Sequence, residues 1–387
     1  VEFRGNKADG ISNAIANLGT VNFNAATNKN IIFDDAISSD GIVTGTLKIN
    51  NTNTKGSVTF NNAITGNNLV QYDGNLNLNA NLTGNLQTQG GKTYIGATSG
   101  NITAIDGTIT GNSLGEILIN SVAGQTGTVN FLQSISGQKL LTQYNGTVNL
   151  KALLTGNITI ADGNFVSDAN GKILGKATLN NGSAEFNADV TTAEIVNGTM
   201  HQVAGTISTA TVKGGTATFD GTVNNATISN TTTPATFNGA ITNLATVSGG
   251  TSNINGTVKS VSQTAGTVNL NSNLTGSYTH NGGTLNINAA DGATTTVGGA
   301  ITGNGTGEVH INQPSAQTGT VELGNVTNDT VTQHRGVVNL SGLMTGTTYT
   351  LEDGEFNALT GSSLNILNMT NGTFVSAANV GINTFTM

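Results

Sequence analysis

The chain has 387 residues, of which only 9% are charged and 4% aromatic, and it contains 53 glycines, two prolines and no cysteine. The missing cysteines exclude disulfide bonds and Cys-ligated metals, and the absence of any apolar stretch of about 18 residues argues against a transmembrane helix. A net charge of −8, with the basic residues scattered singly, argues against nucleic-acid binding.

A short phrase that begins with glycine recurs along the whole chain. It reads Gly-Thr-Val-Asn-Phe at 19–23 and 127–131, and Gly-Thr-Val-Asn-Leu at 146–150 and 266–270. Variants of the phrase begin at Gly56, Gly74, Gly182, Gly215, Gly319 and Gly336. Outward-facing and apolar positions alternate within each copy, which is the period of a half-buried β-strand.

A second element often follows the phrase at a fixed distance. Four residues after the final Phe or Leu comes an apolar residue, then Thr or Ser and then Gly, as at 64–66, 82–84, 135–137, 154–156, 274–276 and 344–346. We therefore expect the chain to turn a corner after the phrase and to begin a second short strand.

The spacing of the phrases gives the size of the repeating unit. The leading glycines at 319, 336, 354 and 372 lie 17, 18 and 18 residues apart. This spacing predicts an all-β fold, a parallel β-helix (β-solenoid) with about 18 residues and three short strands in each coil. Each coil adds about 4.8 Å, so roughly 20 coils would form a rod on the order of 100 Å long.

The residue types fit this architecture. Val, Ile, Leu and Phe would fill a narrow core, and outward-facing Thr and Asn can form ladders from coil to coil. Asp-Gly pairs at 73–74, 106–107, 162–163 and 353–354 are typical of tight turns and would form corners.

Catalytic carboxylates are the first functional possibility to consider, because glycosidases use a pair of them. Two adjacent acidic pairs occur, Asp34–Asp35 and Glu352–Asp353. Neighbouring side chains on a strand point to opposite faces, and the second pair runs directly into an Asp-Gly turn. We interpret both pairs as solvated turn residues and predict that the chain is not an enzyme.

The histidines give only a weak sign of a metal site. His201, His280, His310 and His334 are far apart in the sequence, and only His310 has a close acidic neighbour, Glu308. Two potential ligands without a third do not make a metal site. We expect the four side chains to lie on the solvated surface, and we predict no metal and no cofactor.

Other motifs also have a structural interpretation. The string Gly111-Asn-Ser113-Leu-Gly115 matches a nucleophile elbow, but a strand-like segment follows where that motif needs a helix, so we predict a solenoid corner. The threonine runs at 231–233 and 294–296 are too irregular for a flat ice-binding array. The calcium-binding nonapeptide of other solenoids is missing.

The sequence pattern of several strand segments resembles that of a known protein family. The segments at 237–242, 266–270, 283–287 and 299–303 resemble passenger domains of Gram-negative autotransporters, and are most similar to rickettsial surface cell antigens of the outer-membrane-protein-B kind. The resemblance covers essentially the whole chain. It implies a right-handed β-helix displayed on the outer membrane, acting in adhesion, host-cell entry or surface coating.

The ends of the chain suggest a part of something longer. We expect residues 1–387 to form a single solenoid, excised from a passenger without its leader or C-terminal membrane barrel. The last residues, 380–387, still alternate as a strand and show no cap, although open solenoid ends need one.

Together these features predict a non-enzymatic, extracellular surface protein, an adhesin or protective coat. Its expected partners are a host-cell surface protein or glycan, neighbouring cells, or further copies of the chain, with no nucleic acid and no membrane insertion of this segment. Residues 84–127 and 188–215 break the coil spacing and are the expected binding regions, although no single binding residue can be assigned. Two alternatives stay open: a carbohydrate-active β-helix such as a lyase or tailspike, and a self-assembling filament or surface-layer protein.

Overall fold

The chain folds as a parallel β-solenoid. A computed structural model describes residues 2–5, 15–16, 19–38, 45–51, 54–229, 233–314 and 316–387. The solenoid has about 19 turns of about 18 residues each, which confirms the predicted fold class. The described residues include no helix that is long and apolar enough to cross a membrane.

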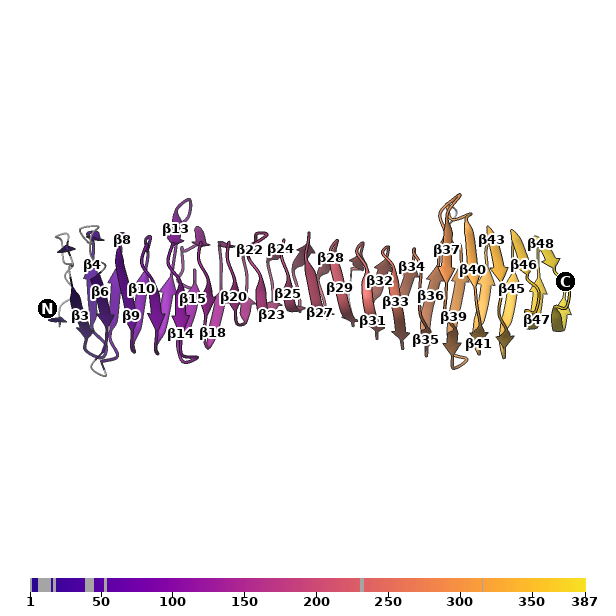
Figure 1. Ribbon diagram of the computed structural model, residues 1–387, viewed down its shortest axis with the longest axis horizontal. Coiled ribbons are helices and arrows are strands. Elements are labelled where there is room, and N and C mark those ends of the chain that lie inside the picture. The colour runs from indigo at the N-terminus through magenta and orange to yellow at the C-terminus, as the bar shows by residue number, and fades with distance from the viewer. Residues whose placement is uncertain are drawn as a thin grey trace. The chain divides into compact units, whose positions relative to one another are not determined.

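The solenoid divides into two compact units, Val1–Gly205 and Thr206–Met387. In each unit the strands stack in parallel (Figure 1). Their pairings define three faces, which we call A, B and C in the order in which the chain visits them within one coil. Some strands are long enough to continue from face A around the corner onto face B.

In the first unit, face A contains β1 (Glu2–Gly5), β3 (Thr20–Ala25), β6 (Gly45–Ile49), β9 (Asn67–Gln71), β11 (Leu86–Thr88), β14 (Ile109–Gly111), β17 (Ile135–Ser136) and β20 (Leu154–Thr155). Face B contains β4 (Asn30–Phe33), β7 (Ser57–Phe60), β10 (Asn75–Leu78), β12 (Lys92–Ile95), β15 (Glu116–Ile119), β18 (Leu140–Gln143) and β21 (Ile158–Ile160). Face C contains β2 (Ile15–Ala16), β5 (Ile37–Ser38), β8 (Ile64–Thr65), β13 (Ile102–Ile105), β16 (Thr128–Phe131), β19 (Thr147–Leu150), β22 (Asn164–Ser167), β24 (Ser183–Phe186) and β26 (Thr199–Gln202). Faces A and B share β23 (Ile173–Leu179) and β25 (Val190–Ile195).

In the second unit, faces A and B share β27 (Thr206–Val212), β29 (Thr222–Ile228), β31 (Ile241–Val247) and β33 (Val258–Gln263). Face A continues with β37 (Thr294–Val297), β40 (Thr320–Leu323), β43 (Val337–Leu340), β46 (Glu355–Ala358) and β48 (Thr373–Ser376), and face B with β35 (Tyr278–His280), β38 (Ile301–Gly303), β41 (Val326–Thr327) and β44 (Met344–Thr345). Face C contains β28 (Thr216–Phe219), β30 (Ala235–Phe237), β32 (Thr251–Ile254), β34 (Thr267–Leu270), β36 (Gly283–Ile287), β39 (Gly307–Ile311), β42 (Thr330–Gln333), β45 (Thr348–Leu351), β47 (Ser363–Met369) and β49 (Gly381–Thr386).

The core is a thin column of aliphatic and aromatic side chains. Every second residue of a strand points inward, as in the buried Val129 and Phe131 of β16. Like residues stack on their copies one coil away; the rings of Phe219 and Phe237 are 4.6 Å apart. Because each apolar side chain contributes roughly 1.5–3 kcal/mol on burial, the coil-to-coil stack carries most of the stability.

The predicted register of the phrase is confirmed. Thr128 of β16 pairs with Thr147 of β19, and Thr147 pairs with Asn164 of β22. The Asp-Gly corners are also confirmed: the backbone N–H of Gly163 donates to Asp162 Oδ1 over 2.8 Å, and Gly163 has a positive φ of 92°.

The phrase does not stay on one face, which its spacing did not predict. In the first unit it lies on face B at β7 and β10, and from β16 onward on face C. In the second unit it lies on face C at β34 and moves to face A at β40. Each move follows an extra loop at the preceding corner, 121–126 or 313–318, so one insertion shifts the repeat by one face.

A buried glutamine marks many of the corners that lack such a loop. Gln71, Gln143, Gln202, Gln263 and Gln333 each precede a glycine by three residues and are fully buried. Each amide donates to that glycine's carbonyl, and those of Gln71, Gln143, Gln263 and Gln333 also donate to the next coil, as Gln143 Nε2 does to Gly146 O (3.1 Å) and Asn164 O (3.0 Å). Each buried amide thus donates to backbone carbonyls at the corner, whereas Gln143 Oε1 accepts no hydrogen bond from the described residues.

Candidate binding grooves

The chain contains a long internal duplication. Residues 71–131 and 263–323 align without a gap, and they share the Gln-x-x-Gly corner, a Gly-Asn-x-x-Gly-Glu segment and the ending Gln-Thr-Gly-Thr-Val. One copy lies in each unit. Each copy contains an extra loop, so the register break predicted to mark a binding region at 84–127 does contain a projecting loop.

An asparagine in the left-handed conformation holds the base of each loop. Asn120 has a φ of 48°, its Nδ2 donates to Gly127 O (3.0 Å), and its Oδ1 accepts from the Ala97 N–H (2.9 Å). Asn312 repeats these bonds in the second copy, with Gly319 O at 3.0 Å and the Ala289 N–H at 2.8 Å. The fully buried clamp fixes where the loop leaves the solenoid.

Asn50 is a third example of the same clamp. It has a φ of 52°, donates to Gly56 O over 2.9 Å and accepts from the Ala25 N–H over 2.9 Å. The residue after this clamp, Asn51, donates its Nδ2 to Asn22 Oδ1 over 3.1 Å. Three corners in the described part of the chain therefore use the same asparagine clamp.

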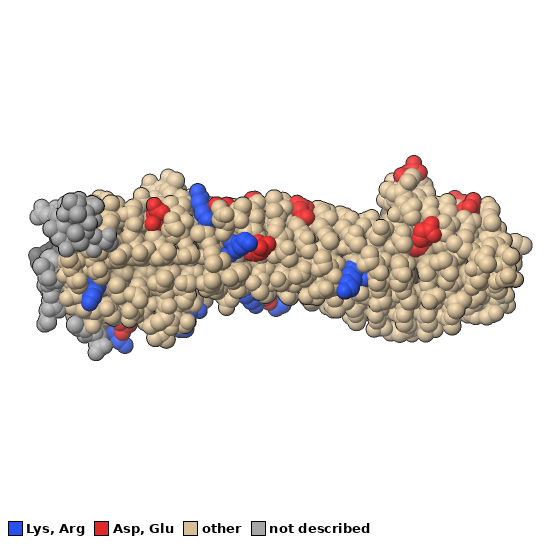
Figure 2. All heavy atoms as spheres, viewed as in Figure 1, with Lys and Arg blue, Asp and Glu red and all other residues tan. Residues whose placement is uncertain are grey.

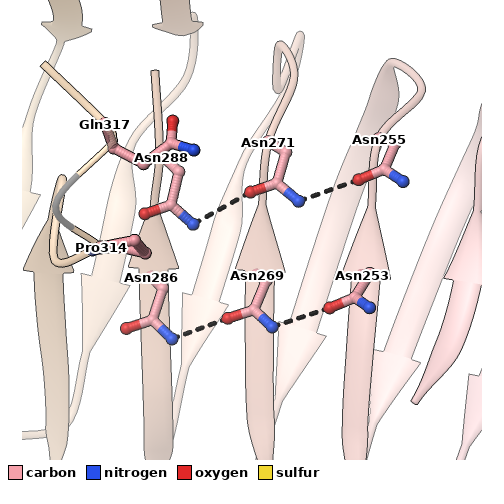
Figure 3. Close-up of a pocket in the computed structure, with 8 residues that line it drawn as sticks. All are labelled: Asn253, Asn255, Asn269, Asn271, Asn286, Asn288, Pro314 and Gln317. Carbon is pink, nitrogen blue, oxygen red and sulfur yellow. Dashed lines mark hydrogen bonds between the residues drawn. The ribbon is translucent and has the colours of Figure 1, made fainter. Parts of the chain in front are cut away.

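Ladders of asparagine amides run along the outside of the strands, as predicted. On face C of the second unit, Asn286 donates to Asn269 and Asn269 to Asn253, each over 2.7 Å. A parallel ladder two residues further along the strands joins Asn288, Asn271, Asn255, Asn238 and Asp220. In both ladders each Nδ2 donates toward the preceding coil, so the amides point the same way (Figure 3).

The two ladders end under the 313–318 loop, and together they form what we call the open groove. It has a volume of about 410 Å³. Its lining consists of Asn253, Asn255, Asn269, Asn271, Asn286, Asn288, Pro314 and Gln317 (Figure 3). No charged side chain lines it. This arrangement presents an array of neutral hydrogen-bonding groups beside one exposed proline ring.

The last oxygen of each ladder has no partner. Oδ1 of Asn286 and Oδ1 of Asn288 are buried and accept no hydrogen bond from the described residues. In the next coil the residue that pairs with Asn286 is His310, and the amide of Asn312 already donates to Gly319 O and Arg335 O. Asn288 is only 5% exposed, so its free oxygen is an orphaned acceptor facing the loop.

The first copy has an equivalent cavity, which we call the closed groove. It has a volume of about 510 Å³ and is lined by Asn61, Asn79, Gly96, Thr98, Asn101, Val122, Ala123, Gly124 and Gln125. Here the loop itself completes the ladder: Gln125 Nε2 donates to Asn79 Oδ1 over 3.3 Å. A side chain at Gly96 would collide with the Gln125 amide. Asn288 occupies the position of Gly96 in the second copy.

The histidines are not all on the solvated surface, so that expectation is wrong. His280 is fully buried, and its Nδ1 lies 3.2 Å from Oδ1 of the equally buried Asp329. The structure also brings together residues that are distant in sequence: His310 Nδ1 and His334 Nε2 are 3.0 Å apart, and His334 Nδ1 is 2.7 Å from Glu352 Oε2. Only the coil register could reveal this neighbourhood.

The histidine neighbourhood does not bring together metal ligands. Glu308 lies 3.5 Å from His310 at the other end of the same network. Among the described residues, no group of three or more His, Asp and Glu side chains could hold a metal ion. His201 lies in β26 and is partly buried.

The acidic pairs lie at turns. Asp34 Oδ1 accepts from Asn61 Nδ2 over 2.8 Å, and Asp353 Oδ1 accepts from the Gly354 N–H over 2.8 Å. On the face shown in Figure 2, charged side chains are sparse and do not form a continuous patch. The carboxylates therefore have structural partners in the corners.

The string around Ser113 forms a corner, as predicted, and strand β15 follows it. Ser113 has a φ of 68°, and its counterpart in the second copy is Gly305, with a φ of 87°. The position needs a left-handed backbone, and the chain replaces serine with glycine there, so the hydroxyl is not what the duplicated corner requires.

The threonine runs do not form a flat array. Thr231 and Thr232 lie outside the described residues, while Thr233 Oγ1 donates to Gly215 O over 2.6 Å. In the second run, Thr295 is buried and its Oγ1 donates to Asn288 O over 2.7 Å. The side chains on either side of Thr295 therefore lie on the opposite face of the strand.

The second expected binding region has no projecting loop. Residues 188–215 form β25, β26 and β27, joined by short turns. The spacing breaks there because the coils are shorter, not because residues are inserted.

The groove residues were not identified from the sequence, although the gapless duplication would have revealed both loops. No family model, curated protein or solved structure matches this chain.

Proposed function

We propose that this chain is a non-enzymatic, surface-exposed β-solenoid that acts in adhesion, as passenger domains of bacterial autotransporters do. The observation that carries the proposal is the repeated pairing of a projecting loop with an asparagine ladder, once in each unit. A solenoid supports such loops rigidly, and two recognition sites on one chain strengthen attachment through multivalency.

The composition of the surface supports a binding role over a catalytic one. The ladders and loops offer amides and hydroxyls, while several of the described carboxylates are hydrogen-bonded within turns or paired with lysines, as Glu116 is with Lys139 over 2.8 Å. Neutral amides recognise polar partners without supplying a general acid or a nucleophile. Binding of this kind depends on many weak contacts along a repetitive surface.

The experiment is binding of the purified chain to cultured epithelial cells, with the loops exchanged for plain corners. Residues 119–127 are replaced by a copy of the corner at 143–146, and residues 311–319 by a copy of the corner at 333–336, because Ile119 pairs with Gln143 and Ile311 with Gln333. Each donor corner stacks directly on its loop, since Asn120 Nδ2 donates to Asn145 O (3.1 Å) and Asn312 Nδ2 to Arg335 O (3.3 Å). The exchange therefore preserves the path of the chain.

We expect the double exchange to abolish cell binding and each single exchange to weaken it by more than half. A matched control duplicates the 143–146 corner in place of the corner at 71–74, where no loop is removed. Thermal unfolding must show that all variants remain folded. Undiminished binding by the folded double exchange would refute the proposal.

A further inference from the structure

We propose that the open groove binds a neutral carbohydrate, whose hydroxyl groups donate to Oδ1 of Asn286 and Oδ1 of Asn288. This inference deepens the proposed adhesive function and names the class of ligand. Its starting point is the pair of orphaned, buried acceptors at the ladder ends. A buried acceptor without a donor carries a desolvation penalty that a bound hydroxyl removes.

The residues that line the open groove favour a neutral ligand with many hydroxyl groups. The lining has no Lys or Arg to attract an anion and no carboxylate to bind a divalent cation. It offers amide groups, which both donate and accept and so match the dual character of sugar hydroxyls. Pro314 adds an exposed apolar surface on which the C–H side of a sugar ring can pack.

The spacing of the ladders suits an extended ligand. Asn286 lies in β36 and Asn288 directly follows it, so with extended backbone their side chains stand about 6.4–6.8 Å apart. Along the ladder direction, successive amides repeat at about 4.8 Å. The groove is thus a two-dimensional grid of amides, and a chain of linked sugar rings can contact several of its points at once.

The first copy shows how such a groove is closed. There Gln125 satisfies the terminal ladder oxygen of Asn79, and glycine at position 96 leaves room for the glutamine amide. In the second copy Asn288 takes the place of Gly96, and no bond joins the corresponding Gln317 to the ladder. One side chain therefore decides whether the loop or a ligand completes the ladder.

The two copies supply matched variants. Asn288→Gly should let Gln317 approach Asn271 and close the open groove. The backbone there tolerates glycine, because the Thr103 Oγ1 bond to Gly96 O (2.8 Å) in the first copy matches the Thr295 bond to Asn288 O. Conversely, Gly96→Asn should displace Gln125 and open the closed groove.

The test is calorimetric titration of the whole chain with cellohexaose, maltohexaose and a mannohexaose, with a heparin hexasaccharide as a charged comparator. We expect at least one neutral hexasaccharide to bind at one site per chain, and Asn288→Gly to lower its affinity about tenfold or more. Asn238→Gly is the matched control, because it removes an amide from the same ladder outside the groove, and it should change affinity less than twofold.

Three results would overturn the inference: no neutral hexasaccharide binds, only heparin binds, or folded Asn288→Gly binds as tightly as the natural chain. Gly96→Asn should raise the stoichiometry from one to two, and an unchanged stoichiometry would contradict the role given to Gln125. Cell binding separates this inference from the proposed function. A chain that binds cells through its loops but binds no hexasaccharide keeps the adhesive function and loses the carbohydrate.

Discussion

His280 and Asp329 face each other in the core of the second unit, with Nδ1 and Oδ1 only 3.2 Å apart and both side chains fully buried. They are two coils apart, and the coil between them has glycine at positions 303 and 307. A larger residue at Gly303 would collide with the Asp329 carboxylate, and one at Gly307 would collide with the His280 imidazole. The first copy fills the equivalent place with a neutral pair, since Thr88 Oγ1 donates to Gln138 Oε1 over 2.8 Å.

This relationship predicts strong coupling between the two residues. Asp329→Ala or His280→Ala leaves the other ionisable group buried without its partner, so each should lower the free energy of unfolding by about 3–5 kcal/mol. The double variant His280→Thr, Asp329→Gln reproduces the pair of the first copy and should be more stable than either single variant. Urea unfolding measures all three, and a double variant no more stable than the single variants would contradict the coupling.

Two buried tyrosines donate to the corner glutamines. Tyr349 OH donates to Gln333 Oε1 over 2.6 Å, and Tyr278 OH donates to Gln263 Oε1. Burial raises the pKa of both phenols well above 10, and for Tyr278 the charge of Asp329 adds to the shift. Tyr349→Phe leaves a buried amide oxygen without its donor and should cost about 1–3 kcal/mol in thermal or urea unfolding.

The same shift predicts the alkaline behaviour of the chain. In the unfolded chain a tyrosine ionises near pH 10, whereas in the folded chain these two ionise only well above it. Their contribution to stability is therefore complete below pH about 10 and is lost as the pH rises further. Absorbance at 295 nm should show two tyrosines that ionise only as the chain unfolds. Their ionisation in the still-folded chain would contradict the prediction.

Much of the fold could be predicted because a solenoid repeats local information. The period-two alternation of the phrase specified the strands, the glycine spacing specified the coil, and outward asparagines such as Asn269 and Asn286 implied the ladders. The strands and the ladders depend only on residues one coil away. Once the coil length is known, the positions of these residues follow.

The groove and the buried pairs could not be predicted in this way. Asn288 and Pro314 meet only because the loop rises from the coil after Asn288 and leans back over it, and the spacing of the phrase does not reveal which corner widens. His310 and His334 meet for a related reason, since their contact depends on how many residues each corner holds. The aligned duplication at 71–131 and 263–323 is the signal that would have located the two loops.

The asparagine clamp predicts that loop position depends on one buried amide. Asn312→Ala removes the bonds to Gly319 O, the Ala289 N–H and Arg335 O, and places alanine at a positive φ. We expect a loss of about 2–4 kcal/mol, since several buried groups lose their partners and the left-handed backbone adds roughly 1–2 kcal/mol of strain.

Hydrogen exchange provides the specific test of the clamp. Amides of residues 316–318 and the Ala289 N–H should exchange faster in Asn312→Ala, while those of strands β28 and β30 should not change. Asn312→Gly is the matched control, because it removes the side chain but keeps the backbone conformation free of strain. Equal stability of the alanine and glycine variants would show that strain contributes nothing.

The Glu116 carboxylate should contribute a small amount to the stability of the folded chain. This contribution should be lost in acid and has no equivalent in the second copy. Its side chain is 18% exposed and lies between Lys139, at 2.8 Å, and Lys92, at 3.8 Å. The hydrogen bond from Lys139 is the largest cause that lowers its pKa, opposed by desolvation. Because the folded pKa is lower, the stabilisation is present above the unfolded value of about 4.3 and is lost as the pH falls through the folded value.

Glu116→Gln should therefore cost about 0.2–1 kcal/mol at pH 7 in low salt, the range of an ion pair whose lysines are exposed, and less at pH 2. The counterpart in the second copy, Glu308, has threonines where Glu116 has Lys92 and Leu140 as strand neighbours. Glu308→Gln is thus the matched control with no lysine to lose. Urea unfolding of Glu116→Gln at the two pH values tests this prediction. An equal loss of unfolding free energy at both would show that the charge of the Glu116 carboxylate has no role.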